Sequence, residues 1–537
     1  MQQRLRYPLD VDAFVTVDRR FLLRGLAASA LVATGSGFAA RHALANPVFG
    51  AYPFSLGVAS GDPAPDGFVI WTKIAPKPLE RGGGMPMQPV SVDWQVASDP
   101  QMQRVVQKGT ATARPELGHA VHVETAGLEP ARDYYYRFTI GRERSRIGRA
   151  STLPAAGSPV AELRFAAAGC QRYDDGYFTA WRKIAEERFD LVFHYGDYIY
   201  EYRIVRPGER PLPVVRVMPG EPDEIYTLDD YRHRYAIYKT DPDLQAAHAS
   251  APFVMTYDDH EIDNNWAGDV SAKNVPPEIF RLRRAAAFQA WYEHMPVRRT
   301  MMPRGPEMLA YRRFSVGDLM TVNVLDTRQY RSDQPCGDGI KIDCKEALAP
   351  ERTMLGATQE RWLYDGFKDA PARWNVMAQQ VMVMRNNRSP DPAVTALGMD
   401  KWDGTPAARD RLFAAITDSR LSNPVVLTGD IHNNWAGLLK KNFADENSPA
   451  VGVEFVATSI SSGGDGYDTS PLITKAMAQD PHIKFFNGQR GYVRHVVTPQ
   501  RWQADYQVLD KVSERDGKLS TRKSLIVENG SAALNDP

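Results

Sequence analysis

Cysteine is scarce in this sequence, which has three cysteines among 537 residues. Three thiols allow one intramolecular disulfide at most, so a fold that depends on many disulfides is excluded. An excess of charge of one sign is also lacking, because 65 basic residues balance 65 acidic ones. No bulk field therefore favours a nucleic acid or an anionic membrane as a partner. Any partner has to be inferred from a site.

Long apolar runs are absent as well. The apolar stretch that runs to about Ala40 is too short and too interrupted for a stable membrane span. It follows the pair Arg19 and Arg20 and precedes Ala-Leu-Ala at 43–45. This order predicts a twin-arginine export signal over 1–45, cleaved after Ala45, and a periplasmic or secreted protein. The alternative is an amphipathic first helix, for which the Gly, Ser and Ala content is unfavourable.

Two cysteines lie close together and one stands alone. Cys336 and Cys344 are eight residues apart in PCGDGIKIDC, which favours a short disulfide-closed loop in an oxidising compartment. Cys170 ends the segment LRFAAAGC. It is either a small buried apolar residue or a thiolate ligand or nucleophile.

The pattern of the chain changes near residue 153. Before it, alternating apolar and polar residues predict short strands in GFVIWTKI, VSVDWQVA, AVHVETAG and DYYYRFTIG. We expect residues 46–153 to form a small antiparallel β-sandwich, followed by a linker rich in Ala, Gly, Ser and Pro. From 154 to 537, short apolar strands alternate with helical stretches such as YFTAWRKIAEER, which predicts an α/β domain.

Five predicted strands of this second region end in polar clusters. The clusters are Cys170-Gln171, Gly196-Asp197-Tyr198, Asp258-Asp259-His260-Glu261, Asp326-Thr327-Arg328-Gln329 and Gly429-Asp430-Ile431-His432. Sites in α/β domains collect at the carboxyl ends of the strands, so these residues are expected to converge. A single such Asp is most often a cap or a turn residue. Several buried carboxylates together repel one another unless cations neutralise them, which predicts bound metal.

The candidate ligands sort by type. The thiolate of Cys170, the phenolate of Tyr200 and the imidazole of His432 suit a transition metal, and ferric iron more than zinc. The oxygens of Asp197, Asp259, Asn264 and Asp430 suit calcium or another hard cation. Asp197 follows its strand in HYGDYIYEY and is placed to bridge two metals, with Tyr200 three residues on. Tyr198 and Tyr202 are interpreted as packing aromatics.

The segments GCQRYDDGY, HYGDYIYEY, YDDHEIDNNW, LDTRQYR, GDIHNNW and TSISSGGDG resemble the PhoD-type alkaline phosphatase and phosphodiesterase family. The resemblance runs from about Phe54 to the C-terminus. It implies a four-layer α/β metallophosphatase fold, with two central mixed sheets flanked by helices. It also implies one ferric iron with one or two calcium ions. Cys170, Asp197, Tyr200 and His432 would be assigned to iron, and Asp197, Asp259, Asn264 and Asp430 to calcium.

The expected chemistry is hydrolysis of phosphate mono- and diesters, with a metal-activated oxide or hydroxide as nucleophile. His260 is predicted to protonate the leaving group or to contact phosphate, and alternatively only to orient Asp259. Arg328 is predicted to contact phosphate with both arms of its guanidinium, and alternatively to pair with Asp326. Two other functions stay open. One is a phospholipase D-like or teichoic-acid-type phosphodiesterase, and the other is an envelope binding protein with structural metals.

Overall fold

The computed structural model describes residues 47–220, 223–368 and 370–537. The predicted export signal over 1–45 lies outside these ranges. Within them, no helix combines the length and the apolar character needed to cross a membrane. The fold is a mixed α/β structure with a β-rich N-terminal region, as the sequence predicts.

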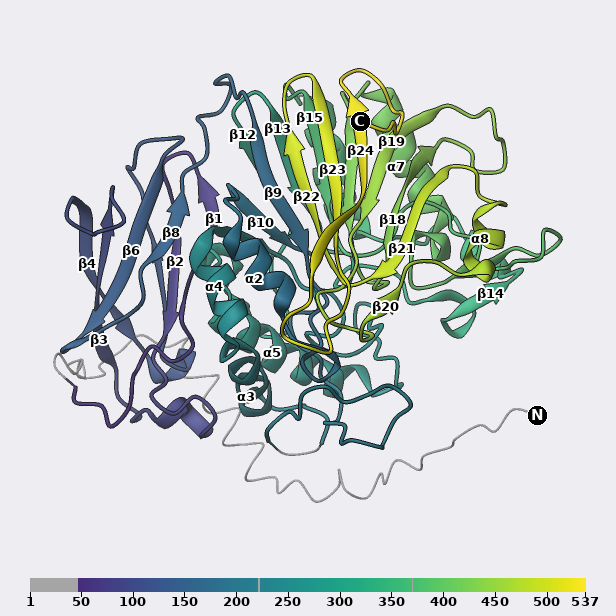
Figure 1. Cartoon of the computed structure of the whole chain (residues 1–537). Coiled ribbons are helices and arrows are strands. Elements are labelled where there is room, and N and C mark those ends of the chain that lie inside the picture. The colour runs from purple at the N-terminus through teal and green to yellow at the C-terminus, as the bar shows by residue number, and fades with distance from the viewer. Residues whose placement is uncertain (1–46, 221–222, 369) are drawn as a thin grey trace. The chain divides into compact units, whose positions relative to one another are not determined.

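The largest sheet has nine strands (Figure 1). Its order is β24(Leu519–Glu528), β23(Arg501–Leu509), β22(Gly491–Val497), β9(Leu163–Ala168), β10(Leu191–His194), β11(Pro252–Met255), β1(Val58–Ala64), β2(Gly67–Lys73) and β5(Ala120–Glu124). The central strands β9, β10, β11 and β1 are parallel, and the strands on either side are antiparallel. The strands β22 and β23, which follow one another along the chain, form an antiparallel hairpin.

A second sheet has eight strands. Its order is β12(Arg312–Val316), β13(Met320–Val324), β15(Trp374–Ala378), β17(Pro424–Thr428), β19(Ala450–Val456), β18(Asn434–Lys440), β21(Ile483–Gln489) and β20(Gly466–Tyr467). The strands β13, β15, β17 and β19 run parallel to one another. A short ladder joins β14(Ile340–Ile342) to β16(Ala396–Gly398) beside it.

One apolar core lies between the two large sheets. Alternate residues of facing strands meet there, including Phe165 and Phe193 from the nine-stranded sheet and Val376 and Phe455 from the eight-stranded sheet. The intervening residues of the same strands, such as Ala166 and Val192, face a different core. Both faces of the central strands are therefore buried, which explains their nearly continuous apolar sequences.

Seven helices are present in the described ranges, and most pack on these sheets. They are α2(Thr179–Glu186), α3(Leu228–Lys239), α4(Pro242–Ser250), α5(Pro277–His294), α6(Gly356–Lys368), α7(Pro406–Asp418) and α8(Pro471–Met477). The first four share a core with the nine-stranded sheet, and α6 and α7 share one with the eight-stranded sheet. The helix α5 ends at His294, two residues before Pro296, a residue type that disfavours continuation of a helix.

The N-terminal region is joined to the rest of the chain by main-chain hydrogen bonds. Its second sheet contains β4(Val105–Ala113), β3(Val90–Ala97), β6(Asp133–Ile140), β7(Glu143–Arg144) and β8(Gly148–Ser151). This sheet packs on β1, β2 and β5 through a shared core. However, β1 also pairs with β11 in parallel, with Ser60 opposite Pro252. One sheet of the expected sandwich is thus the edge of the nine-stranded sheet, a pairing between distant segments that local patterning does not reveal.

Gly61 is the residue at which β1 approaches β11 most tightly. It lies opposite Phe253, and a Cβ atom at position 61 would lie 2.6 Å from the Phe253 carbonyl oxygen and even closer to that of Pro296. We predict that Gly61→Ala lowers the free energy of unfolding by about 1 to 3 kcal/mol, because a methyl group has no room there. Urea denaturation measures this. Gly50→Ala is the control, since its Cβ meets nothing within 4 Å. Equal stability of both variants would contradict the tight approach.

Candidate metal centre

The candidate site is built from loops that follow strands of both large sheets. The loops after β9, β10 and β11 carry Cys170, Asp197 and Asp259, and the loop after β17 carries Asp430 and His432. The sheets pack face to face, so these strand ends meet at one edge. The convergence predicted from the sequence is present.

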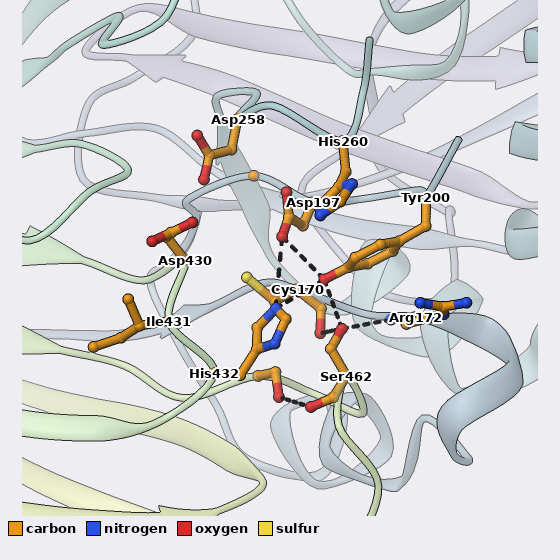
Figure 2. A network of polar contacts seen from close by, with 12 residues as sticks. Cys170, Arg172, Asp197, Tyr200, Asp258, His260, Asp430, Ile431, His432 and Ser462 are labelled. Atoms are coloured by element: carbon orange, nitrogen blue, oxygen red, sulfur yellow. Dashed lines mark hydrogen bonds and ion pairs between the residues drawn. The ribbon is translucent and has the colours of Figure 1, made fainter. Parts of the chain in front are cut away.

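Four of the predicted ligands form one compact group (Figure 2). Ligand atoms of Cys170, Asp197 and His432 all lie within 4.8 Å of one another. The Tyr200 hydroxyl donates to Asp197 Oδ2 at 2.9 Å and lies 3.0 Å from His432 Nε2. These are the four residues that the resemblance assigns to iron.

Carboxylates form a second group that adjoins the first. Asp258, Asp259 and Asp430 have ligand oxygens within 4.8 Å of one another, and so do Asp197, Asp259 and His260. Asp197 and Asp259 connect the groups. The two groups differ in exposure. Asp258 and Asp259 are almost completely buried, whereas 16% of the Asp430 side chain and 31% of the His432 side chain are exposed. The site is therefore open on the side of the loop that follows β17.

The chemistry of the two groups fits bound cations. Asp197 Oδ1 and Asp259 Oδ1 are buried and have no hydrogen-bond donor among the described residues. Burial, and next the charge of Asp197, raises the pKa of the Cys170 thiol and of the Tyr200 phenol well above their usual ranges. Burial and the neighbouring Asp400 raise the pKa of Asp430 to about 7. The part of these shifts that comes from neighbouring carboxylates reflects negative charge that metal ions would offset.

The main chain is unusual at the same positions. The φ angle is positive at Cys170 (52°), Asp197 (56°), Asp430 (66°) and His432 (55°). This left-handed conformation costs a residue other than glycine about 1 to 2 kcal/mol. Local stability alone does not favour it, and such strain is concentrated at functional sites. Here it directs four side chains, from the loops after β9, β10 and β17, towards one point.

His260 is held by a buried glutamate. Its Nδ1 lies 2.8 Å from Glu201 Oε2, and its ring centroid lies 4.2 Å from that of Tyr200. Burial lowers the pKa of His260, but the carboxylates of Asp259, Glu201 and Asp197 outweigh burial and raise it well above its usual range. The histidine therefore has a fixed orientation beside Asp259, which suits either of the roles expected for it.

Arg328 has other partners than those expected. Its guanidinium is completely buried, with Nε 2.5 Å from Asp258 Oδ1 and Nη1 2.7 Å from Asp400 Oδ1. Asp326 instead accepts the main-chain N–H groups of Arg328 and Gln329. Two of the three side-chain nitrogens are thus engaged within the protein. The arrangement argues against a two-armed phosphate contact and against the Asp326 ion pair, and makes Arg328 a counter-cation of the carboxylate group.

Asn264 lies at the edge of the site. Its carboxamide oxygen accepts a 2.7 Å hydrogen bond from the Tyr202 hydroxyl, and its main-chain N–H donates to Glu201. A carboxamide oxygen has a second lone pair, so this contact leaves one for a cation. The following residue, Asn265, donates its main-chain N–H to Asp259 Oδ2 at 2.7 Å and is therefore a positioning residue in this arrangement.

Two further residues belong to the site, and one of them was not singled out from the sequence. Ser462 Oγ lies 2.7 Å from the Cys170 carbonyl oxygen and from the Tyr200 hydroxyl (Figure 2). It belongs to TSISSGGDG, one of the segments that carry the resemblance. Asp400 follows no predicted strand, and nothing in the sequence marks it as the partner of Arg328.

Glu261 connects two of the ligand loops. Its buried carboxylate accepts main-chain N–H groups from Asp197 at 3.2 Å, Tyr198 at 2.5 Å and Asp258 at 2.8 Å. The hydrogen bonds fix the start of the loop after β10 against the loop after β11. In the sequence, Glu261 is the last residue of DDHE. Its role was not predicted, because the neighbouring Asp259 and His260 are the more usual ligand and proton donor.

Comparisons with known proteins agree with this geometry. Residues 165–506 match the family model of the PhoD-like phosphatase, and residues 39–154 match that of its N-terminal domain. The chain is 47% identical to alkaline phosphatase D of Bacillus subtilis (strain 168) over 97% of its own length and 89% of that protein. A solved structure described as PhoD has 48% identity and a TM-score of 0.88, and the match covers 91% of this chain and 93% of that one.

The fold and the site together define an enzyme of the phosphatase class, with a site suited to metal. The chain belongs to the PhoD-like phosphatase family.

The hydrogen bonds of Glu261 lead to a prediction about the ligand loops. In Glu261→Gln, the side-chain NH2 would face a main-chain N–H. We expect the free energy of unfolding to fall by about 1 to 3 kcal/mol, as when a buried main-chain donor is left without an acceptor. Bound metal per chain should fall as well, measured by elemental analysis. Glu446→Gln, at an exposed position, is the control. Unchanged stability and metal content would mean that Glu261 does not hold these loops.

Proposed function

We propose that this protein is a metal-dependent phosphatase that hydrolyses phosphate monoesters and diesters and releases phosphate. The observation that carries the proposal is the convergence of Cys170, Tyr200 and His432 with a group of buried aspartates. Within this group, two buried carboxylate oxygens have no donor among the described residues. Membership of the PhoD-like phosphatase family supports the reaction class.

The ligand types support one ferric iron and one or two calcium ions. Cys170, Asp197, Tyr200 and His432 would hold iron, because a thiolate and a phenolate favour a ferric ion. Asp197, Asp259, Asn264 and Asp430 would hold calcium, with Asp258 as a further oxygen ligand. Bound cations supply charge to neutralise the phosphoryl oxygens and to activate the attacking oxygen. The residues of this chain fix those positions, and Arg328 and Glu261 fix the loops that carry them.

His260 is proposed as the proton donor to the leaving group. Glu201 orients its Nδ1 side, so that the other ring nitrogen is the one available for transfer. The substrate would approach from the open side, where Asp430 and His432 are partly exposed. An enzyme needs such an open position, whereas a purely structural metal site is closed. This, together with the family, argues against a binding protein whose metals are only structural.

The alternative activity is a phosphodiesterase that acts on phospholipid head groups or teichoic-acid-type chains, because the proposed ligands do not select the groups that flank the phosphate.

We further propose export by the twin-arginine machinery to the periplasm or the exterior, with removal of residues 1–45. Residues 46–153 would be the N-terminal domain and 154–537 the catalytic domain. The cores on both faces of the two large sheets support a four-layer arrangement.

The proposal is tested first by metal analysis, visible absorption and turnover of p-nitrophenyl phosphate and bis-p-nitrophenyl phosphate. The wild type should contain iron and show a visible charge-transfer band, and Cys170→Ala should lose iron, band and activity together. Tyr200→Phe should shift or abolish the band, because the phenolate is removed. Tyr202→Phe is the matched control and should keep the band. Zinc alone, with an unaffected Cys170→Ala variant, would refute the ferric site.

The role of His260 predicts a dependence on the leaving group. His260→Asn should slow hydrolysis of an alkyl phosphate by about 10² to 10⁴, since an alkoxide needs a proton as it leaves. Hydrolysis of a p-nitrophenyl ester should slow much less, because p-nitrophenolate leaves without one. Comparison of kcat for the two substrate types measures this difference. An equal loss for both would assign His260 to the orientation of Asp259 instead.

A further inference from the structure

Arg490 is a buried cation beside the site that is not among the proposed ligands. It lies between β21 and β22, and only 4% of the residue is exposed. Its guanidinium donates four hydrogen bonds, and every acceptor is an uncharged oxygen. Burial lowers its pKa to about 10, and the charge of Asp175 offsets only part of this effect. Arginines as buried as this are usually paired with a carboxylate, as Arg328 is with Asp258. The acceptors of Arg490 therefore have to account for its burial.

These acceptors lie on loops that carry or support the proposed iron ligands. Nη1 donates to the His432 carbonyl oxygen at 2.5 Å, to the Ser462 carbonyl oxygen at 2.8 Å and to Ser459 Oγ at 2.7 Å. Nη2 donates to the Gly488 carbonyl oxygen at 2.6 Å. One guanidinium thus connects the loop after β17 to the segment TSISSGGDG.

Both connections lead to proposed ligands. His432 has a left-handed main chain, with a φ angle of 55°, and its carbonyl oxygen accepts from Arg490 and from Thr458 Oγ1 at 3.0 Å. The Ser462 hydroxyl lies 2.7 Å from the Tyr200 hydroxyl (Figure 2). Arg490 therefore fixes one proposed ligand directly and a second one through Ser462.

The glycines of TSISSGGDG leave room for this guanidinium. A Cβ atom at Gly466 would lie 2.7 Å from Arg490 Nη2 and 3.0 Å from Nε. A Cβ atom at Gly463 would lie 3.6 Å from Nη1. The φ angle of Gly466 is 76°, a conformation that other residues rarely adopt. The segment is thus shaped around Arg490, which gives its glycines a role that does not involve substrate.

We propose that Arg490 is a positioning residue of the metal centre, which holds His432 and, through Ser462, Tyr200 in the arrangement that binds iron. This inference rests on the proposed function and specifies how the same site is kept in shape for its metal. The guanidinium is planar and has donors on both arms, so one group can hold two loops in a fixed relation. Groups that fix metal ligands in this way change metal affinity or activity by about 10- to 100-fold when they are removed.

The test uses the iron-loaded protein and two measurements besides activity. They are the wavelength of the visible charge-transfer band and the rate at which EDTA removes iron. In Arg490→Gln, the Ser462 hydroxyl loses its fixed place beside the Tyr200 oxygen. A phenolate that accepts one hydrogen bond fewer gives up an electron more easily, so the band should move to longer wavelength while iron is still bound. Iron release should be about 10- to 100-fold faster.

Two further variants separate the parts of this argument. Arg490→Lys keeps the positive charge but lacks the forked donors, so its band position and release rate should lie between those of the wild type and Arg490→Gln. Ser462→Ala removes only the hydroxyl beside Tyr200 and should move the band in the same direction. These two variants decide the question if Arg490→Gln does not fold, which circular dichroism establishes.

The control is Arg149→Gln. Arg149 also donates to main-chain carbonyl oxygens of two segments, those of Phe189 at 2.8 Å and Ser250 at 3.0 Å. These residues precede β10 and β11, so they lie at the opposite ends of the strands from the site. Band position and iron release in this variant should match the wild type.

Three results would overturn the positioning role. They are wild-type band and release rate in both Arg490 variants, an unshifted band in Ser462→Ala, and changes in Arg149→Gln as large as those in Arg490→Gln. A wild-type protein without iron and without turnover of either p-nitrophenyl ester would instead contradict the proposed function.

Discussion

Electrostatic repulsion among several carboxylates buried at one point is the main constraint on this structure. Asp197, Asp258 and Asp259 are almost fully enclosed, and Asp430 adjoins them. In a region of low dielectric constant, such charges repel strongly. Within the protein, Arg328 and His260 offset only part of this repulsion. Burial, together with this remaining negative charge, raises the pKa values of Cys170, Tyr200 and Asp430, and the remaining charge is the basis of the affinity for cations that we propose.

The two-sheet architecture is what makes this concentration of charge attainable. Parallel strands of both sheets end at the same edge, and each contributes a short loop. The left-handed residues in these loops are individually unfavourable, but they are held by hydrogen bonds from buried side chains. Glu261 fixes the loops after β10 and β11, and Ser462 fixes the loop after β9 against Tyr200. The strained loops of the site are thus stabilised by a surrounding network of hydrogen bonds within the protein.

Much of the site was predictable because it follows from local patterns. An apolar strand that ends in a polar cluster identifies Cys170, Asp197 and His432, and the periodicity of YFTAWRKIAEER and its counterparts identifies the helices. Contacts between distant segments were not predictable. The pairing of Arg328 with Asp258 and Asp400 depends on three loops, and a sequence motif suggested Asp326 only because it is close along the chain. The pairing of β1 with β11 was not predictable for the same reason, because the two strands are far apart along the chain.

The pairing of β1 with β11 affects whether the N-terminal region and the rest of the chain can fold separately. Ser60 and Pro252 are roughly 190 residues apart along the chain, so the edge formed by β11 is completed only by a slow, long-range step. If the segment before residue 154 were removed, β11 would present an uncovered row of main-chain donors and acceptors, which is a template for association with other molecules. The N-terminal region therefore acts as a protective cover for a strand edge. The boundary between the two family models is in this respect not a boundary between independent folding units.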